Sequence, residues 1–180
     1  MAYENVILQN EQLTFSKNAY DWLGNGVYFW EANRQRAYEW AEEKASRGEY
    51  NNPAVIGAVI DLGYCLNLTD SAYVPLLKIG YDLLRIRLEN DGKKLPVNRG
   101  GTDRVYRYLD CAVIEQIHDY KRTDKQREFD SARGIFIEGN EIYEGSGFRE
   151  QTHVQLCIRN PNCIKGYFNP LKENAKYILP

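Results

Sequence analysis

The chain of 180 residues has few of the side chains on which metal centres and disulfide frameworks depend. It contains four cysteines, none of them in a Cys-x-x-Cys pair, and only two histidines. Zinc sites and disulfide-stapled folds need closely spaced sulfur or imidazole groups. The sequence therefore predicts no metal site, and it predicts that the thiols are reduced and structural.

Long apolar runs are also missing. The longest run covers residues 53–60, whereas a helix that crosses a bilayer needs roughly 20 apolar residues. The first ten residues lack the basic start and apolar stretch of a secretory signal. The 23 basic and 25 acidic residues give a net charge of −2, which excludes a strongly basic chain but permits a local basic patch. We expect a soluble, cytoplasmic protein without a membrane partner.

The length favours one domain that spans residues 1–180. Apolar residues at helical spacing predict helices over residues 33–47, 74–88 and 103–120. Short segments rich in β-branched and aromatic residues predict strands at 26–30, 54–61, 133–138, 153–159 and 164–168. Because these elements show no regular strand–helix–strand alternation, we expect the α+β class.

Two glycines, Gly24 and Gly26, precede the aromatic strand of residues 26–30, and an amphipathic helix follows almost at once. The pair does not make a dinucleotide-binding Gly-x-Gly-x-x-Gly fingerprint, which would follow a strand and open a helix. A phosphate-binding loop with its lysine is also absent from the sequence. The simplest interpretation of the two glycines is a turn that leads into a core strand.

The whole of residues 16–41, SKNAYDWLGNGVYFWEANRQRAYEWA, resembles the second motif of the ADP-ribosyltransferase superfamily, in its poly(ADP-ribose) polymerase and diphtheria-toxin-like branch. The resemblance implies a fold of split mixed and antiparallel β-sheets with flanking helices, and NAD as co-substrate. Tyr28 matches the tyrosine that stacks on nicotinamide, and an aromatic face suits this flat cationic ring. Gly26, Arg36 and Trp40 fall at or beside further NAD-binding positions. Glu39 stands where the family usually has a second stacking tyrosine.

A second match covers residues 155–164, QLCIRNPNCI, which resemble the segment where the family's catalytic glutamate opens a strand. Gln155 occupies the glutamate position, so its amide could bond the ribose hydroxyls without supplying charge. Glu138 or Glu150 could supply the missing carboxylate. Alternatively, Gln155 is an ordinary polar residue at the start of a strand.

Longer strings, DWLGNGVYFWE, RYLDCAVIE, GIFIEGNEIYEGSGF and THVQLCIRNPNCIKGYF, look like those of small bacterial ADP-ribosyltransferase-like toxins of toxin–antitoxin–chaperone phage-defence systems. This resemblance implies RNA as acceptor, a neutralising antitoxin and a chaperone. It also implies that residues 143–151 form an acceptor-binding loop, in which Phe148 and Arg149 contact a base or phosphate. His153 shares a strand face with Gln155 and could orient or deprotonate the nucleophile, or it could be structural.

One family element has no match, because the His-Gly-Thr/Ser/Cys strand should precede the tyrosine and the first histidine here is His118. Two further hypotheses therefore stand beside transfer to RNA. The enzyme could modify a protein side chain or simply hydrolyse NAD. The chain could instead be a non-catalytic module that binds NAD or ADP-ribose.

Overall fold

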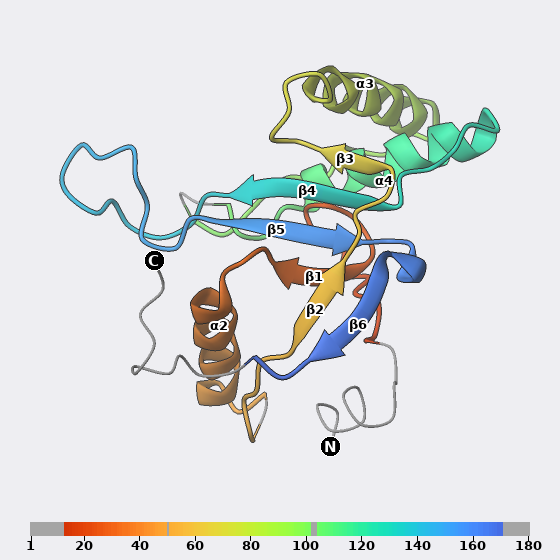
Figure 1. Cartoon of the computed structure of the whole chain (residues 1–180). Coiled ribbons are helices and arrows are strands. Elements are labelled where there is room, and N and C mark those ends of the chain that lie inside the picture. Colours follow the sequence, from red (N-terminus) through yellow and green to blue (C-terminus); the bar gives the residue numbers. More distant parts are fainter. Residues whose placement is uncertain (1–12, 50, 102–103, 171–180) are drawn as a thin grey trace, which may run out of the picture.

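The computed structural model of the chain describes residues 13–49, 51–101 and 104–170. Helices and strands alternate irregularly along these residues, as Figure 1 shows. In chain order the elements are β1 (Val27–Trp30), α2 (Arg34–Ser46), β2 (Gly57–Ile60), β3 (Cys65–Asn67), α3 (Val74–Asn90), α4 (Tyr108–Thr123), β4 (Ser131–Phe136), β5 (His153–Ile158), a short 3₁₀ turn (Pro161–Cys163) and β6 (Ile164–Phe168).

The strands form two sheets (Figure 1). The larger sheet has the order β1-β5-β4-β3, in which β5 runs antiparallel to both of its neighbours and β3 runs parallel to β4. The smaller sheet pairs β2 with β6 antiparallel. The structure thus confirms the predicted combination of helices with separate mixed and antiparallel sheets.

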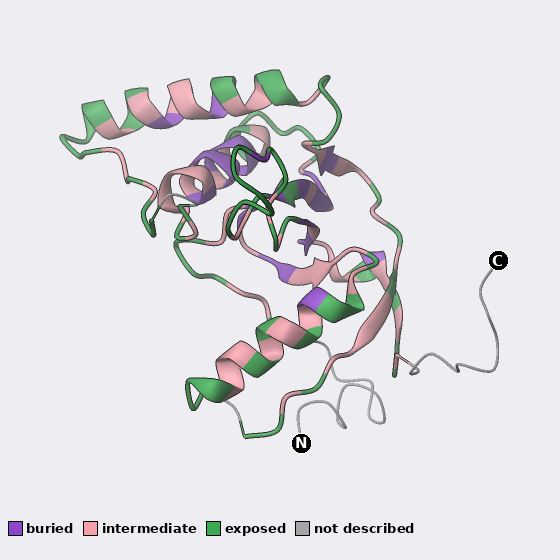
Figure 2. Cartoon of the chain, turned by 90° about the vertical axis from the view of Figure 1, so that its left-hand side faces the viewer, coloured by how far each residue is buried: buried purple, intermediate pink, exposed green. Residues whose placement is uncertain are grey.

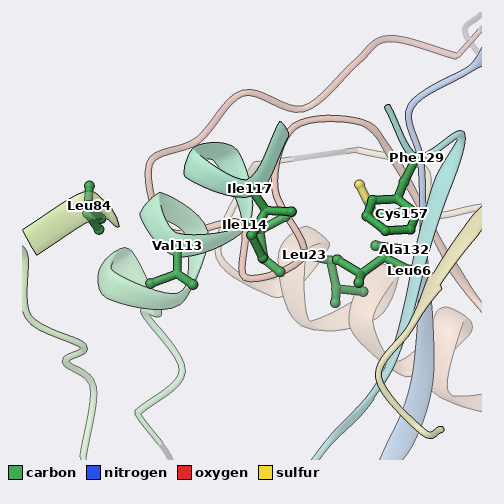
Figure 3. Packing of buried hydrophobic residues seen from close by; sticks show 9 residues of the cluster. All are labelled: Leu23, Leu66, Leu84, Val113, Ile114, Ile117, Phe129, Ala132 and Cys157. Atoms are coloured by element: carbon green, nitrogen blue, oxygen red, sulfur yellow. The ribbon is translucent and has the colours of Figure 1, made fainter. Parts of the chain in front are cut away.

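One face of the larger sheet is covered by α4, and α3 packs on the outer side of α4. Figure 3 shows Leu84 of α3 on one side of α4, with Ile114 of α4 pointing towards Ala132 and Cys157 of the sheet. These four side chains are at most 1% exposed. Figure 2 shows the contrast between the buried α4 and the α3 surface, which is largely exposed. This core fixes the face of β5 on which Gln155 lies.

The opposite face of the larger sheet carries a second core, which lies against residues of the smaller sheet. Val27 of β1 and Leu156 and Ile158 of β5 are buried there, together with Cys163. Ile60 of β2 packs against them. Side chains of a strand alternate between its two faces, so β1 and β5 are held from both sides.

The first predicted helix is confirmed within one residue at each end, as α2. The Asn33 side chain accepts a hydrogen bond from the Arg36 backbone N–H at 2.9 Å, which is the expected N-cap. Only three residues separate β1 from α2, so this cap fixes the start of α2 close to the end of β1.

The predicted start of the third helix is wrong. α4 begins at Tyr108 rather than near residue 103. Arg99 and Tyr106 exchange two backbone hydrogen bonds of 2.8 and 2.9 Å, so the chain before α4 is a hairpin. The Asn98 side chain then accepts from the Leu109 N–H at 2.8 Å and caps α4 from outside the helix.

Two strand predictions also need correction. The predicted strand over residues 54–61 is shortened to β2, Gly57–Ile60, and the one over residues 133–138 begins and ends two residues earlier as β4, Ser131–Phe136. β3 was not predicted, because three residues are too few to show a periodic pattern, although its Leu66 is fully buried. No described helix is long and apolar enough to cross a membrane. The described residues also contain no group of three or more potential metal ligands.

Candidate functional site

The two motif segments are far apart in the sequence but lie side by side in the larger sheet. β1 carries Tyr28 and pairs antiparallel with β5, which carries His153 and Gln155. Trp30 is directly opposite Gln155, and Tyr28 is opposite Cys157. Because opposed residues project from one face and residues two apart share it, Trp30, His153 and Gln155 lie on the same face.

A chain of hydrogen bonds fixes the amide of Gln155. The Trp22 Nε1–H donates to Gln155 Oε1 at 2.6 Å. Gln155 Nε2 lies 2.8 Å from His153 Nε2, and His153 Nδ1 lies 2.5 Å from the carbonyl oxygen of Gln151. A carbonyl can only accept, so His153 carries its proton on Nδ1 and accepts from Gln155 at Nε2.

His153 is held in its neutral form by its surroundings. Its side chain is buried, and the rings of Phe136 and Trp30 lie 5.6 and 6.2 Å from the imidazole. Burial lowers the pKa of His153, and the charge of Arg36 lowers it further, while the bond to Gln151 opposes the shift. At neutral pH the ring is therefore uncharged, with its acceptor nitrogen directed at Gln155.

Arg36 ties α2 to the sheet beside this pair. Its side chain is 5% exposed and forms ion pairs with Glu43 at 3.3 Å and Glu138 at 3.2 Å. Two carboxylates offset the cost of burying one guanidinium. On the same helix, Trp40 packs against Trp30 with ring centroids 5.4 Å apart. The indole N–H of Trp30 is buried and has no hydrogen-bond partner among the described residues.

Tyr28 is bound into the turn that precedes its own strand. Its hydroxyl donates to the Gly24 carbonyl at 2.8 Å and accepts from the Leu23 N–H at 3.0 Å. Burial raises the pKa of Tyr28 far above its usual range. Gly26, just before β1, lies tightly against β5, since a Cβ there would be 2.5 Å from the Cys157 sulfur. The tyrosine ring packs against the core that includes Cys157.

A cleft of about 580 Å³ lies between β1, α2 and residues 54–58, which lead into and begin β2. Trp30 and Trp40 line it, so these two rings belong both to the cleft and to the cluster around His153. Asn33 and Arg34 at the start of α2 add polar groups to an otherwise mostly apolar lining. The volume lies in the range of ordinary small-molecule sites, roughly 300–1,000 Å³.

The loop of residues 139–152 projects from the ends of β4 and β5 (Figures 1 and 2). Phe148 is 67% exposed, and Arg149 forms an ion pair with Glu141 of the same loop at 3.4 Å. In the described part of the chain, neither Phe148 nor Arg149 forms a hydrogen bond, ion pair or ring contact with His153 or Gln155.

The predicted residues thus divide into three groups. Arg36, Trp40, His153 and Gln155 are brought into one cluster, which Trp30 connects. Phe148 and Arg149 lie apart from it in the loop. Gly26 and Tyr28 belong to the turn and to β1, and Tyr28 also lines the cleft.

Sequence reasoning did not single out Trp22 or Gly134. Gly134 is paired with Gln155 across β4 and β5. A Cβ at this position would come within 2.5 Å of the Trp22 ring, so glycine makes the space in which Trp22 reaches Gln155. The signal available in the sequence was a glycine inside a strand pattern, which often marks such a close approach.

Comparison with known proteins adds one relative. An uncharacterized protein of Methanocaldococcus jannaschii is 28% identical over 179 residues, which cover 88% of this chain and 78% of that protein. No family model matches the chain, and no solved structure matches it. The relative's name states no activity, so functional reasoning depends on the residues of the site.

Proposed function

We propose that the chain is an NAD-dependent ADP-ribosyltransferase that releases nicotinamide and transfers ADP-ribose to a nucleic acid, with RNA as the acceptor. The observation that carries the proposal is the pairing of β1 with β5, which sets Trp30, a residue that lines the cleft, opposite Gln155. The resemblance of the sequence requires these two segments to act together on one substrate. Their adjacency supports that requirement without testing the reaction.

The cleft suits NAD in size and chemistry. Trp40 and Trp30 offer aromatic surface for a flat ring. Arg34 is exposed at the first turn of α2 and supplies positive charge for a diphosphate. In this proposal Gln155 meets the ribose next to the scissile bond, and Tyr28, which lines the cleft, contacts the nicotinamide ring.

The reaction breaks the bond between ribose C1′ and the nicotinamide nitrogen, and the bonding electrons leave with nicotinamide. The acceptor forms the new bond to C1′ and loses a proton. Positive charge that develops on the ribose needs a partner. Gln155 has one amide N–H not used by His153, which can donate to a ribose hydroxyl. Glu138, 3.2 Å from Arg36, supplies the carboxylate of the cluster.

The decisive experiment measures nicotinamide release and the fate of labelled ADP-ribose in mixtures with cellular RNA, DNA or protein. We expect label in RNA with the wild-type chain. Gln155→Ala should reduce transfer at least about tenfold, since a lost bond to a charged centre costs about 1.5–3 kcal/mol. Tyr120→Phe, an exposed change on α4, serves as the matched control. Label in protein alone would favour the protein-modifying alternative.

A second candidate, a non-catalytic module that binds NAD or ADP-ribose, is favoured by one observation. The amide oxygen of Gln155 is already bonded to Trp22, and one of its N–H groups is used by His153. Such a residue could serve structure alone. Calorimetric binding of ADP-ribose without any nicotinamide release from NAD would support the module and contradict the enzyme.

A further inference from the structure

One exposed surface outside the cluster combines aromatic rings with cations. Tyr20 and Tyr106 are 37% and 47% exposed, and their rings meet edge to face with centroids 5.4 Å apart. The Tyr108 ring also meets Tyr20 edge to face, with centroids 5.9 Å apart. Together with Arg99 and Arg104, these residues are called the tyrosine–arginine surface.

The two arginines of this surface are open to solvent. Arg99 and Arg104 are exposed, and neither forms an ion pair within the described residues. The two backbone hydrogen bonds between Arg99 and Tyr106 hold one cation beside one ring. Asp103, which precedes Arg104 in the sequence, lies outside the described residues. Two described carboxylates near this surface have other partners, since Asp21 accepts from the Asn18 N–H and Asp110 accepts from the Asn98 amide.

The surface adjoins Gln155 through two side chains. The Arg107 guanidinium lies 5.3 Å from the centre of the Trp22 ring. Trp22 follows Tyr20 by two residues and donates its indole hydrogen bond to Gln155 at 2.6 Å. Trp22 therefore connects the segment that carries Tyr20 to Gln155.

The loop of residues 139–152 has the opposite charge. Its only cation, Arg149, is paired with Glu141, and Glu144 and Glu150 add further exposed carboxylates. Phosphate groups are repelled by such a loop and attracted by Arg99 and Arg104. The charges therefore favour the tyrosine–arginine surface, rather than the loop, as the binding site of an acidic polymer.

We propose that the tyrosine–arginine surface binds a single-stranded nucleic acid, with bases stacked on Tyr20 and Tyr106 and phosphates bound by Arg99 and Arg104. As the acceptor surface, this assignment rests on the function proposed above. Aromatic platforms beside cations are the usual means of holding unpaired strands, because every base has a stacking face. In a duplex the bases are stacked on one another and the grooves present only their edges, so no base face is available to these rings.

The test is fluorescence anisotropy of a fluorescein-labelled single-stranded RNA oligonucleotide with the full chain, without NAD. Tyr106→Ala should weaken binding at least about fivefold. Arg99→Gln should weaken binding and reduce the slope of log affinity against log salt by about 0.7, the value for one phosphate of a single strand. Circular dichroism of each variant checks that it folds.

Two exposed residues elsewhere give matched controls, Tyr120→Ala on α4 and Arg47→Gln after α2. Neither should change the affinity. The proposal is overturned if Tyr106→Ala binds as tightly as Tyr120→Ala, or if Phe148→Ala causes the loss instead. It is also overturned if the wild-type chain binds no RNA at low salt.

The assay separates this proposal from the proposed reaction. RNA binding that depends on Tyr106, without nicotinamide release from NAD by the wild-type chain, would support the surface and contradict the transferase. Nicotinamide release without RNA binding would contradict the proposed role of the surface. It would remain compatible with a transferase that acts on another acceptor.

Discussion

The exchange Gln155→Glu tests the hydrogen-bond chain of the cluster directly. In the wild-type chain the Gln155 amide donates to His153 Nε2 and accepts from Trp22. A carboxylate keeps the bond from Trp22 but has no hydrogen to give to His153. Two acceptors then face each other at the 2.8 Å now spanned by a hydrogen bond. The conflict disappears when His153 binds a second proton, because an imidazolium donates from both nitrogens.

The two proteins should therefore respond to pH with opposite signs. In the wild-type chain the pKa of His153 lies below its usual value, so the unfolded state binds more protons and this residue's stabilising effect is lost as the pH falls. In Gln155→Glu the carboxylate raises the pKa of His153, so its stabilisation is present at low pH and is lost as the pH rises through that value. Arg36 and Glu138, whose charges act on His153, are the same in both proteins.

The magnitude follows from one lost hydrogen bond and one unsatisfied buried group. Near pH 8 we expect Gln155→Glu to be less stable than the wild type by about 1.5–3 kcal/mol. For a chain of this length that corresponds to roughly 3–12 °C in melting temperature. Thermal unfolding from pH 5 to 8 measures the difference, which should shrink as the pH falls. A difference that is constant over this range would refute the assigned tautomer and the chain of bonds.

Further predictions concern the support of the cluster. Tyr28→Phe removes both hydroxyl bonds to the turn and should cost about 1–3 kcal/mol in urea unfolding; an unchanged midpoint would show that the turn does not need them. Gly134→Ala should displace Trp22, costing about 1–3 kcal/mol and changing its fluorescence, whereas unaltered emission would contradict the close approach. Burial lowers the pKa of His118 to about 4, so stability should fall as the pH drops from about 6.5 towards that value, and His118→Phe should fall less steeply. Strong expression of the wild-type chain should arrest growth of a bacterial host and Gln155→Ala should not; equal growth would count against a toxin that an antitoxin must neutralise.

The parts of the fold that the sequence predicted are those with a local cause. α2 was predicted nearly to the residue, because Asn33 caps it and apolar residues recur at helical spacing. The start of α4 was not predicted correctly, because its cap is the distant side chain of Asn98. The pairing of Arg99 with Tyr106 between them shows no helical or strand periodicity in the sequence. β3 was not predicted for a related reason, since it is a strand only because it pairs with β4.

The site divides in the same way. The resemblance named His153 and Gln155 by position, but it could not show that they are bonded to each other. Trp22 is bonded to Gln155 across 133 positions of the sequence, and no local pattern encodes such a contact. Only the glycine at 134, inside a strand of otherwise larger residues, hinted that something lies against the sheet there.

The hydrogen bonds of the cluster give a physical reason for a glutamine, rather than a glutamate, at residue 155. A neutral imidazole with its proton on Nδ1 needs a donor opposite Nε2, and the indole of Trp22 needs an acceptor. A glutamine supplies both from one side chain, whereas a glutamate supplies only acceptors. Histidine at 153 and an amide at 155 are therefore coupled choices. If the reaction needs an anion near the ribose, it must come from a residue outside this pair. Glu138 is the carboxylate that the cluster offers, and its ion pair with Arg36 fixes where that charge lies.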